Sequence, residues 1–185
     1  MRSSANQNSN LLRSHSHRGF SLIELLIVVA IILIIAAIAI PNMLRSKMTA
    51  NQAAAVANLR TISTASVSYW VTYSNGYPAS LAILGGSSPP ATCNLAILID
   101  ETISLAPSQK NGYQYAYTGD QGNVSNPPAG CTPGFNGYLA TATPLSIGLT
   151  GDISYCTNEP GVIHYDTTGA LVGGSGACDA LPVIQ

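Results

Sequence analysis

Charged side chains are scarce in this sequence: Asp, Glu, Lys and Arg together make up 8% of its 185 residues. Soluble domains usually carry more. Basic residues are especially few after residue 18, where only Arg45, Lys47, Arg60 and Lys110 are found. Nucleic-acid binding needs a basic stripe whose counterions are released on binding. The shortage of Lys and Arg therefore argues against a nucleic-acid partner.

The sequence also lacks the residue groups on which catalysis usually depends. Its serines have no G-x-S-x-G or comparable context, and its scattered carboxylates form no pair at a spacing suited to acid–base chemistry. The Gly-rich piece at 173–176 lacks the Lys and the strand–helix setting of a phosphate loop. His164, on a β-prone run, is interpreted as a surface histidine. We therefore predict no enzymatic activity and no catalytic residues.

Cysteine spacing excludes the common zinc sites. The four cysteines, Cys93, Cys131, Cys156 and Cys178, include no C-x-x-C pair, and the only nearby histidine is His164. In an oxidising compartment four such cysteines form two disulfides, for which three connectivities exist. We expect the sequential pairing, Cys93 with Cys131 and Cys156 with Cys178, because each bond would tie a loop to the predicted sheet.

What the sequence has in abundance is one apolar run near its start. From Leu25 to Ile40 no residue is polar. As an α-helix, Phe20–Ile40 would be long enough to cross a bilayer core of about 30 Å. Two ordinary interpretations are open. One is a cleaved secretory signal with a small-residue site at 37–39, and the other is a plain membrane anchor.

Glu24 fits neither of these interpretations well. An ionised carboxylate inside a spanning helix costs at least about 2.5 kcal/mol, so such a residue is usually paired or functional. A plain anchor offers no reason for it. The length also argues against a secretory signal, because the run after Glu24 already exceeds the usual apolar region of such a signal.

The segment Gly19–Glu24, G-F-S-L-I-E, followed by an apolar run that ends at Pro41, resembles the class III signal of type IV pilins and their pseudopilin relatives. The resemblance implies that a membrane-embedded prepilin peptidase cuts after Gly19 and then methylates the new amine of Phe20. It also implies that Glu24 pairs with the amine of a neighbouring subunit. An α-amine with a reference pKa of about 8 is mostly cationic at neutral pH, and a buried carboxylate needs such a partner. Four positions apart, Phe20 and Glu24 are expected to share one helix face.

Four segments are expected along the chain. They are a cleaved basic leader (1–19), an apolar transmembrane and filament-core helix (20–41), its amphipathic continuation (42–75) and a globular α/β head (76–185). The continuation carries a stripe at spacings of three and four, formed by Val56, Leu59, Ile62, Ser66, Tyr69 and Tyr73. Pro41 predicts a kink, and Asn75-Gly76 predicts the end of a helix on the order of 80 Å long.

In the head, Gly, Pro, Ser and Thr separate short apolar pieces. We expect short helices at 78–84 and 94–103, and an irregular tail from Gly173. Runs at 113–117, 138–143, 153–157 and 162–166 predict a small antiparallel sheet laid across the stripe. The predicted fold class is therefore α+β, a pilin fold with a long N-terminal helix packed on the sheet. The Cys156–Cys178 bond would resemble the disulfide-bounded carboxy-terminal loop of type IV pilins.

The predicted function is structural, as a subunit of a type IV pilus or pilus-like filament. The alternative is a major or minor pseudopilin of a type II secretion system, and a DNA-binding or adhesive minor pilin is less favoured. Expected partners are like subunits, the prepilin peptidase, an inner-membrane assembly platform and, before assembly, membrane lipid. The expected location is the inner membrane, as a single-pass protein, and then a surface pilus or a periplasmic pseudopilus. No cofactor is predicted, although a pseudopilin would bind calcium, for which Asp152 or Asp166 could serve.

Overall fold

The computed structural model describes residues 19–185 except residues 88, 160, 171 and 185. The predicted basic leader therefore lies outside the described residues, apart from Gly19. The chain separates into two compact units, residues 1–41 and residues 42–185. The second unit contains every strand of the described chain, and it is the head to which the following paragraphs refer.

Helix α1 runs from Leu22 to Tyr73, a length of 52 residues, and Pro41 lies inside it. The predicted long helix is thus confirmed, while the kink at Pro41 stays a prediction. The helix stops where the sequence indicates, because Ser74 and Gly76 both have positive φ, 49° and 70°. Left-handed backbone of this kind closes the C-terminal ends of helices and is adopted most readily by glycine.

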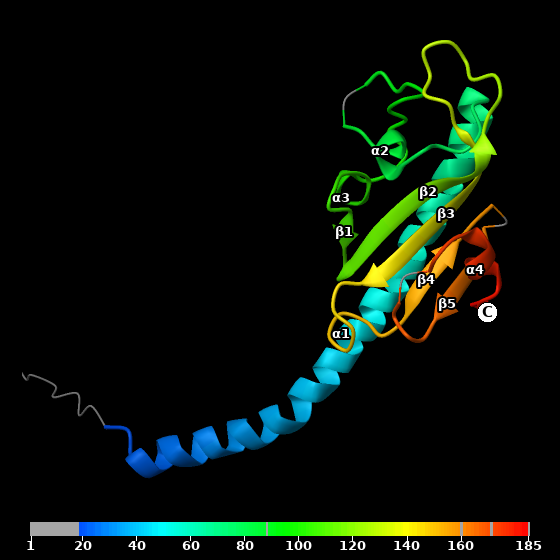
Figure 1. Cartoon of the computed structure of the whole chain (residues 1–185). Coiled ribbons are helices and arrows are strands. Elements are labelled where there is room, and N and C mark those ends of the chain that lie inside the picture. Colours follow the sequence, from blue (N-terminus) through cyan, green and yellow to red (C-terminus); the bar gives the residue numbers. More distant parts are fainter. Residues whose placement is uncertain (1–18, 88, 160, 171, 185) are drawn as a thin grey trace, which may run out of the picture. The chain divides into compact units, whose positions relative to one another are not determined.

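A five-stranded antiparallel sheet forms the centre of the head, in the order β1-β2-β3-β4-β5 (Figure 1). The strands are β1 Gln109–Lys110, β2 Tyr113–Asn123, β3 Phe135–Pro144, β4 Ser154–Thr157 and β5 Ile163–Asp166. The last four correspond to the predicted β-prone runs. β1 was not predicted, although the Asn111-Gly112 pair that joins it to β2 is a typical sequence signal for a hairpin turn. Both residues have positive φ, 53° and 74°, as a type I′ turn requires.

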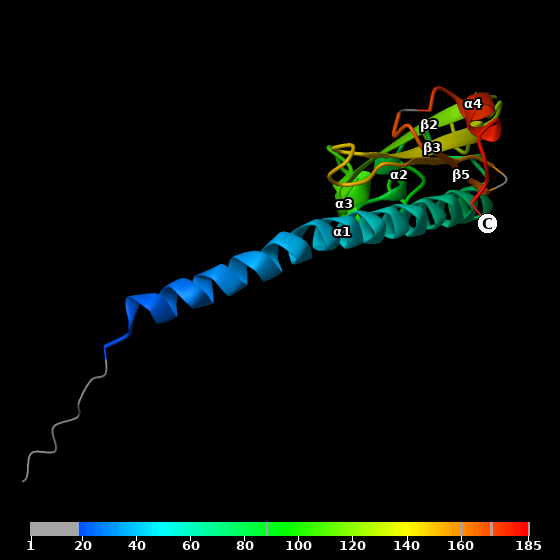
Figure 2. The ribbon, with the colours of Figure 1, turned by 90° about the horizontal axis from the view of Figure 1, so that it is seen from below.

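Within the head, α1 covers one face of the sheet (Figure 2). The buried residues of α1 are Ala55, Leu59, Ile62, Ala65, Ser66 and Tyr69. They pack against inward-pointing tyrosines of β2 and β3, which alternate with exposed residues along β2. A second, smaller core on the other face joins Leu139 to the buried Cys156 and Cys178. The α+β class and the helix-on-sheet packing are therefore confirmed.

Two local predictions were wrong. The run 94–103 is helical only at its end, in α3 (Glu101–Ser104), because the backbone N–H groups of residues 96–98 donate to carbonyls of residues 83–85 instead. Those carbonyls belong to α2 (Leu81–Leu84) and the residue that follows it, so the segment lies beside α2 without helical hydrogen bonds of its own. The tail is not irregular throughout, since α4 (Ser175–Asp179) forms where Cys178 is bonded to β4.

Candidate processing and assembly site

The N-terminal end of α1 holds the side chain of Glu24 over the first turn. Ser21 immediately precedes the first helical residue, and its carbonyl accepts the first helical bond, from the N–H of Leu25, at 3.2 Å. The backbone N–H of Ser21 donates to Oε2 of Glu24 at 2.9 Å. A Ser followed three residues later by a Glu that reaches back to the Ser N–H is a capping box. Glu24 therefore closes the end of its own helix, a role that the sequence analysis missed although the S-x-x-E spacing was its signal.

The expected helix-face relation between Phe20 and Glu24 is absent from this form of the chain. Phe20 lies before the capping residue and is not helical, because Ser21 has left the helical path. Its side chain is 76% exposed, and Gly19 beside it is exposed as well. The peptide bond between Gly19 and Phe20 thus lies in exposed, non-helical chain. The carboxylate of Glu24 is also exposed, and its second oxygen can accept from a further donor.

The side chains of residues 25–40 form an apolar surface around the whole helix. An 18-residue window of α1 has a mean hydropathy of 3.3, and none of it is buried within the chain. Among the residues described, α1 is the one helix long and apolar enough to cross a membrane, and signal sequences near an N-terminus share these properties. A helix that is apolar on all sides needs lipid or other protein around it.

At the other end of α1, Asn75 is fully buried and connects three parts of the head. Its Nδ2 donates to the hydroxyl of Tyr69 at 3.0 Å and to the carbonyl of Thr132 at 2.8 Å. Its Oδ1 faces the N–H of Gly134 at 3.4 Å. The hydroxyl of Tyr69 in turn donates to the carbonyl of Cys93 at 2.6 Å. The residue that the sequence analysis used only as a helix stop therefore holds the helix end against the Cys93–Cys131 loop.

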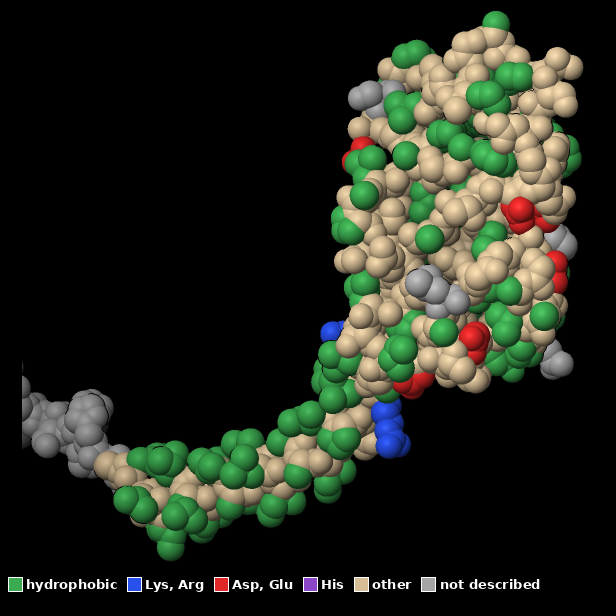
Figure 3. Space-filling view, viewed as in Figure 1, with side chains coloured by type: hydrophobic (Ala, Val, Ile, Leu, Met, Phe, Trp, Pro, Cys, Tyr) green, Lys and Arg blue, Asp and Glu red, His purple; other side chains and the backbone are tan. Residues whose placement is uncertain are grey.

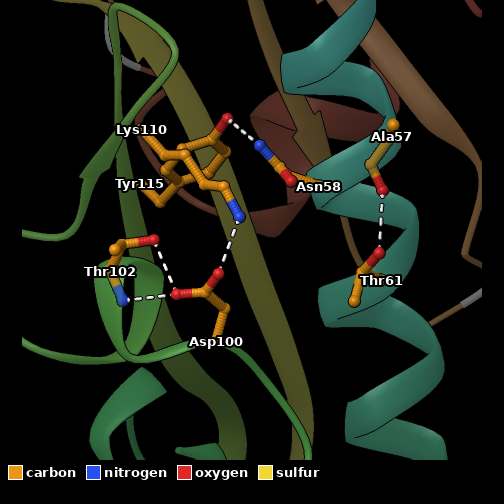
Figure 4. A network of polar contacts seen from close by, with 7 residues as sticks. All are labelled: Ala57, Asn58, Thr61, Asp100, Thr102, Lys110 and Tyr115. Atoms are coloured by element: carbon orange, nitrogen blue, oxygen red, sulfur yellow. Dashed lines mark hydrogen bonds and ion pairs between the residues drawn. The ribbon is translucent and has the colours of Figure 1, made fainter.

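Polar contacts also hold the α3 edge of the sheet and the middle of α1 (Figure 4). Lys110 is 2.9 Å from Asp100, which also accepts from the N–H and the hydroxyl of Thr102. The hydrogen bond from Lys110, together with those from Thr102, holds the pKa of Asp100 well below its usual range. Nearby, Nδ2 of Asn58 donates to the hydroxyl of Tyr115 at 2.8 Å and joins α1 to β2. One of the few basic residues of the chain is thus used within the head.

The disulfides are Cys93–Cys131 and Cys156–Cys178, the sequential pairing that was expected. His164 is not a surface histidine as predicted. It is 7% exposed, and its Nδ1 lies 2.7 Å from the carbonyl of Leu181, because the C-terminal segment pairs with β5 and covers it.

The two carboxylates proposed as calcium ligands are engaged in local contacts. Asp152 accepts from the N–H of Gly148 at 3.0 Å, and Asp166 accepts from the N–H and hydroxyl of Thr168. Within the described part of the chain, no group of three or more His, Cys, Asp or Glu side chains could hold a metal ion. No cofactor or metal site is therefore assigned to either residue.

Comparison with known proteins finds a family motif at the start of the apolar helix and similarity to two pilins. Residues 14–40 match the family model of the prokaryotic N-terminal methylation motif. The chain is 52% identical over 54 residues to the type IV major pilin protein PilA of Myxococcus xanthus, a match that covers 29% of this chain and 24% of the relative. It is 40% identical over 84 residues to the type IV wide pilus major component PilA4 of Thermus thermophilus, covering 44% of this chain and 63% of the relative.

The match thus spans about a quarter of the Myxococcus xanthus relative and somewhat under two thirds of the Thermus thermophilus relative. No solved structure matches it. The exposed Gly19–Phe20 bond and the capped Glu24 lie inside the matched methylation motif, and the α+β architecture agrees with the expected fold. The chain therefore carries the N-terminal methylation motif, a class III signal, and is similar in sequence to two type IV major pilins.

Proposed function

We propose that this chain is a precursor of a filament subunit of the type IV pilus class. Cleavage after Gly19 by a prepilin peptidase would remove residues 1–19 and make Phe20 the new N-terminus, whose amine would then be methylated. The match of residues 14–40 to the methylation motif supports this proposal most directly. The exposure of both residues supports it as well, because the peptidase must reach the bond before the apolar run.

In this proposal the segments act in turn. Residues 20–41 hold the subunit in the inner membrane and later enter the filament core, with a kink at Pro41 adjusting the helix to its neighbours. Residues 42–75 join the core to the globular α/β part formed by 76–185. The partners are like subunits, the processing enzyme and an inner-membrane assembly platform. The final location is a pilus on the cell surface.

Burial explains why such a polymer would not shed subunits into water. The apolar part of α1 carries more than a dozen large apolar side chains that are each about half exposed or more. Burying them from water contributes on the order of 20 kcal/mol before ordering costs, at about 25 cal/mol per Å². Transfer from lipid into a filament core brings little hydrophobic gain, since lipid tails are equally apolar. Packing and the pairing of Glu24 with a neighbouring amine must therefore set the register during assembly.

Both named relatives are major components of pili, which favours a pilus over a pseudopilus. Mass spectrometry of the mature N-terminus tests the proposal. N-methylphenylalanine at position 20 is expected. An N-terminus at Ile40 would indicate a secreted soluble protein, and an intact Met1 in cells that have the peptidase would indicate a plain anchor. Loss of surface fibres on deletion of the gene would separate a pilus from a periplasmic pseudopilus.

A further inference from the structure

The loop between β3 and β4 exposes an unusual amount of apolar surface for its size. Within five residues it presents Leu145, Ile147 and Leu149, which are 45%, 61% and 56% exposed. The two residues between them in the sequence are Ser146 and Gly148. Contiguous exposed aliphatic side chains of this kind mark contact surfaces more often than isolated ones do.

The loop is held in one conformation by its own hydrogen bonds. The carbonyl of Ser146 accepts from the N–H groups of Leu149 and Thr150 at 3.2 and 2.9 Å. The N–H of Gly148 donates to the carbonyl of Gly151 at 3.2 Å and to Oδ1 of Asp152 at 3.0 Å. The single carboxylate of the loop is therefore used to shape it. The aliphatic side chains are presented by an ordered turn.

Two further bonds place this loop at the start of the head. The N–H of Leu145 donates to the carbonyl of Gly112 at 3.0 Å, and Nδ2 of Asn51 on α1 donates to the carbonyl of Thr150 at 2.9 Å. Asn51 is only ten residues beyond Pro41, where the apolar run ends. The loop is thus attached to the part of α1 that first leaves the proposed membrane span.

The charges beside the loop suit a phospholipid surface. Between residues 42 and 51 of α1 the charged side chains are Arg45 and Lys47, both exposed, and no carboxylate occurs there. Figure 3 shows Lys and Arg side chains at this end of the head, close to hydrophobic side chains and beside an acidic one. Met43 and Leu44 are exposed too, so apolar surface continues to within seven residues of Asn51, about 10 Å along the helix. Interfacial side chains reach about 5–10 Å into the headgroup and acyl boundary.

We propose that Leu145, Ile147 and Leu149 insert into the membrane interface while the subunit waits for assembly, with Arg45 and Lys47 on anionic headgroups. This contact orients the head on the membrane surface and must break when the subunit is extracted. The inference rests on the proposed function, because it requires residues 20–41 to span the bilayer. A second copy of the chain is the other possible occupant. The adjacent basic pair favours lipid, since it matches anionic headgroups, while the exposed Asp152 of the loop is already bonded to the N–H of Gly148.

Tryptophan fluorescence can test this contact, because Trp70 is the only tryptophan of the chain. It lies on α1 nineteen residues beyond Asn51, about 28 Å farther along the helix. The full chain is placed as a single copy in nanodiscs of phosphatidylethanolamine and phosphatidylglycerol with brominated acyl chains. In the native chain the indole of Trp70 should not be quenched. In the Trp70→Phe/Ile147→Trp variant we expect a blue-shifted emission and clear bromine quenching, reduced when Arg45→Gln and Lys47→Gln are added.

The outcomes separate this inference from the proposed function. If the chain stays with the disc but the indole at position 147 is unquenched, the loop does not contact lipid and the inference fails alone. Blue-shifted emission only when two copies share a disc would assign the loop to a subunit contact and would also overturn it. A chain that does not remain with the disc would overturn both the lipid contact and the proposed membrane span.

Discussion

Glu24 is expected to have two separable roles, and Glu24→Gln distinguishes them. In the isolated chain its Oε2 accepts from the N–H of Ser21 at 2.9 Å, and a glutamine carbonyl can accept the same bond. In the proposed filament its negative charge meets a neighbouring amine, which glutamine cannot match. The variant should therefore keep the helix end and the processing site but lose polymerisation.

The two roles differ in the free energy that each contributes. Loss of a helix cap costs about 0.5–2 kcal/mol, and here the capping carboxylate is exposed. Breaking a buried ion pair by removing one partner costs about 3–5 kcal/mol, because the other charge stays buried without compensation. A loss of this size lowers the equilibrium constant for subunit addition by about two to four orders of magnitude. Charge pairing should therefore dominate the effect of the substitution.

The assay compares the native chain, Glu24→Gln and Glu24→Ala in cells that contain the processing enzyme. Mass spectrometry reports cleavage after Gly19, and sheared surface fibres report assembly at equal membrane levels of subunit. We expect both variants to be cleaved and neither to form fibres. Circular dichroism in detergent should show native helicity for Glu24→Gln and slight fraying for Glu24→Ala. Normal fibre yield from Glu24→Gln would refute the pairing argument and leave capping as the role of Glu24.

Three further predictions concern the head. Asn75→Ala should lower the free energy of unfolding by about 2–4 kcal/mol in denaturant titrations, because buried partners lose their hydrogen bonds. A change no larger than that of the exposed control, Asn126→Ala, would contradict this. Replacing Cys156 and Cys178 by alanine should lower the free energy of unfolding by about 3 kcal/mol or more, because the disulfide closes a loop of 22 residues and both side chains are buried. An unchanged midpoint of denaturant unfolding would show that the bond is dispensable. Burial raises the pKa of seven tyrosines, Tyr117 among them, so these phenols lose their protons more easily in the unfolded chain. The free energy of unfolding should therefore keep its full value below about pH 10 and fall as the pH rises above it. Ultraviolet absorbance of tyrosinate should then rise together with unfolding, and titration in the folded state at the ordinary pKa would contradict the packing.

Several head features could not be predicted because they depend on contacts between distant residues. The run 94–103 has helical spacing, yet its N–H groups donate to carbonyls near α2, so tertiary pairing overrides local propensity. His164 has a typical surface-strand context, but the C-terminal segment covers it. β1 is different: the Asn111-Gly112 pair was a readable signal, and the strand is simply very short.

The sequence by itself determined the start of the chain: the S-x-x-E cap, the apolar run, the class III motif and the end of α1 all depend on residues close together in the chain. It also indicated four strands and the helix stripe, because periods of two and 3.6 residues are local properties. Only the tertiary structure decided that Asn75 is a buried connector, that β3 is covered on both faces, and that the loop at 145–149 lies beside Asn51. Those features join residues tens of positions apart, and no local pattern encodes which distant carbonyl or side chain will meet them.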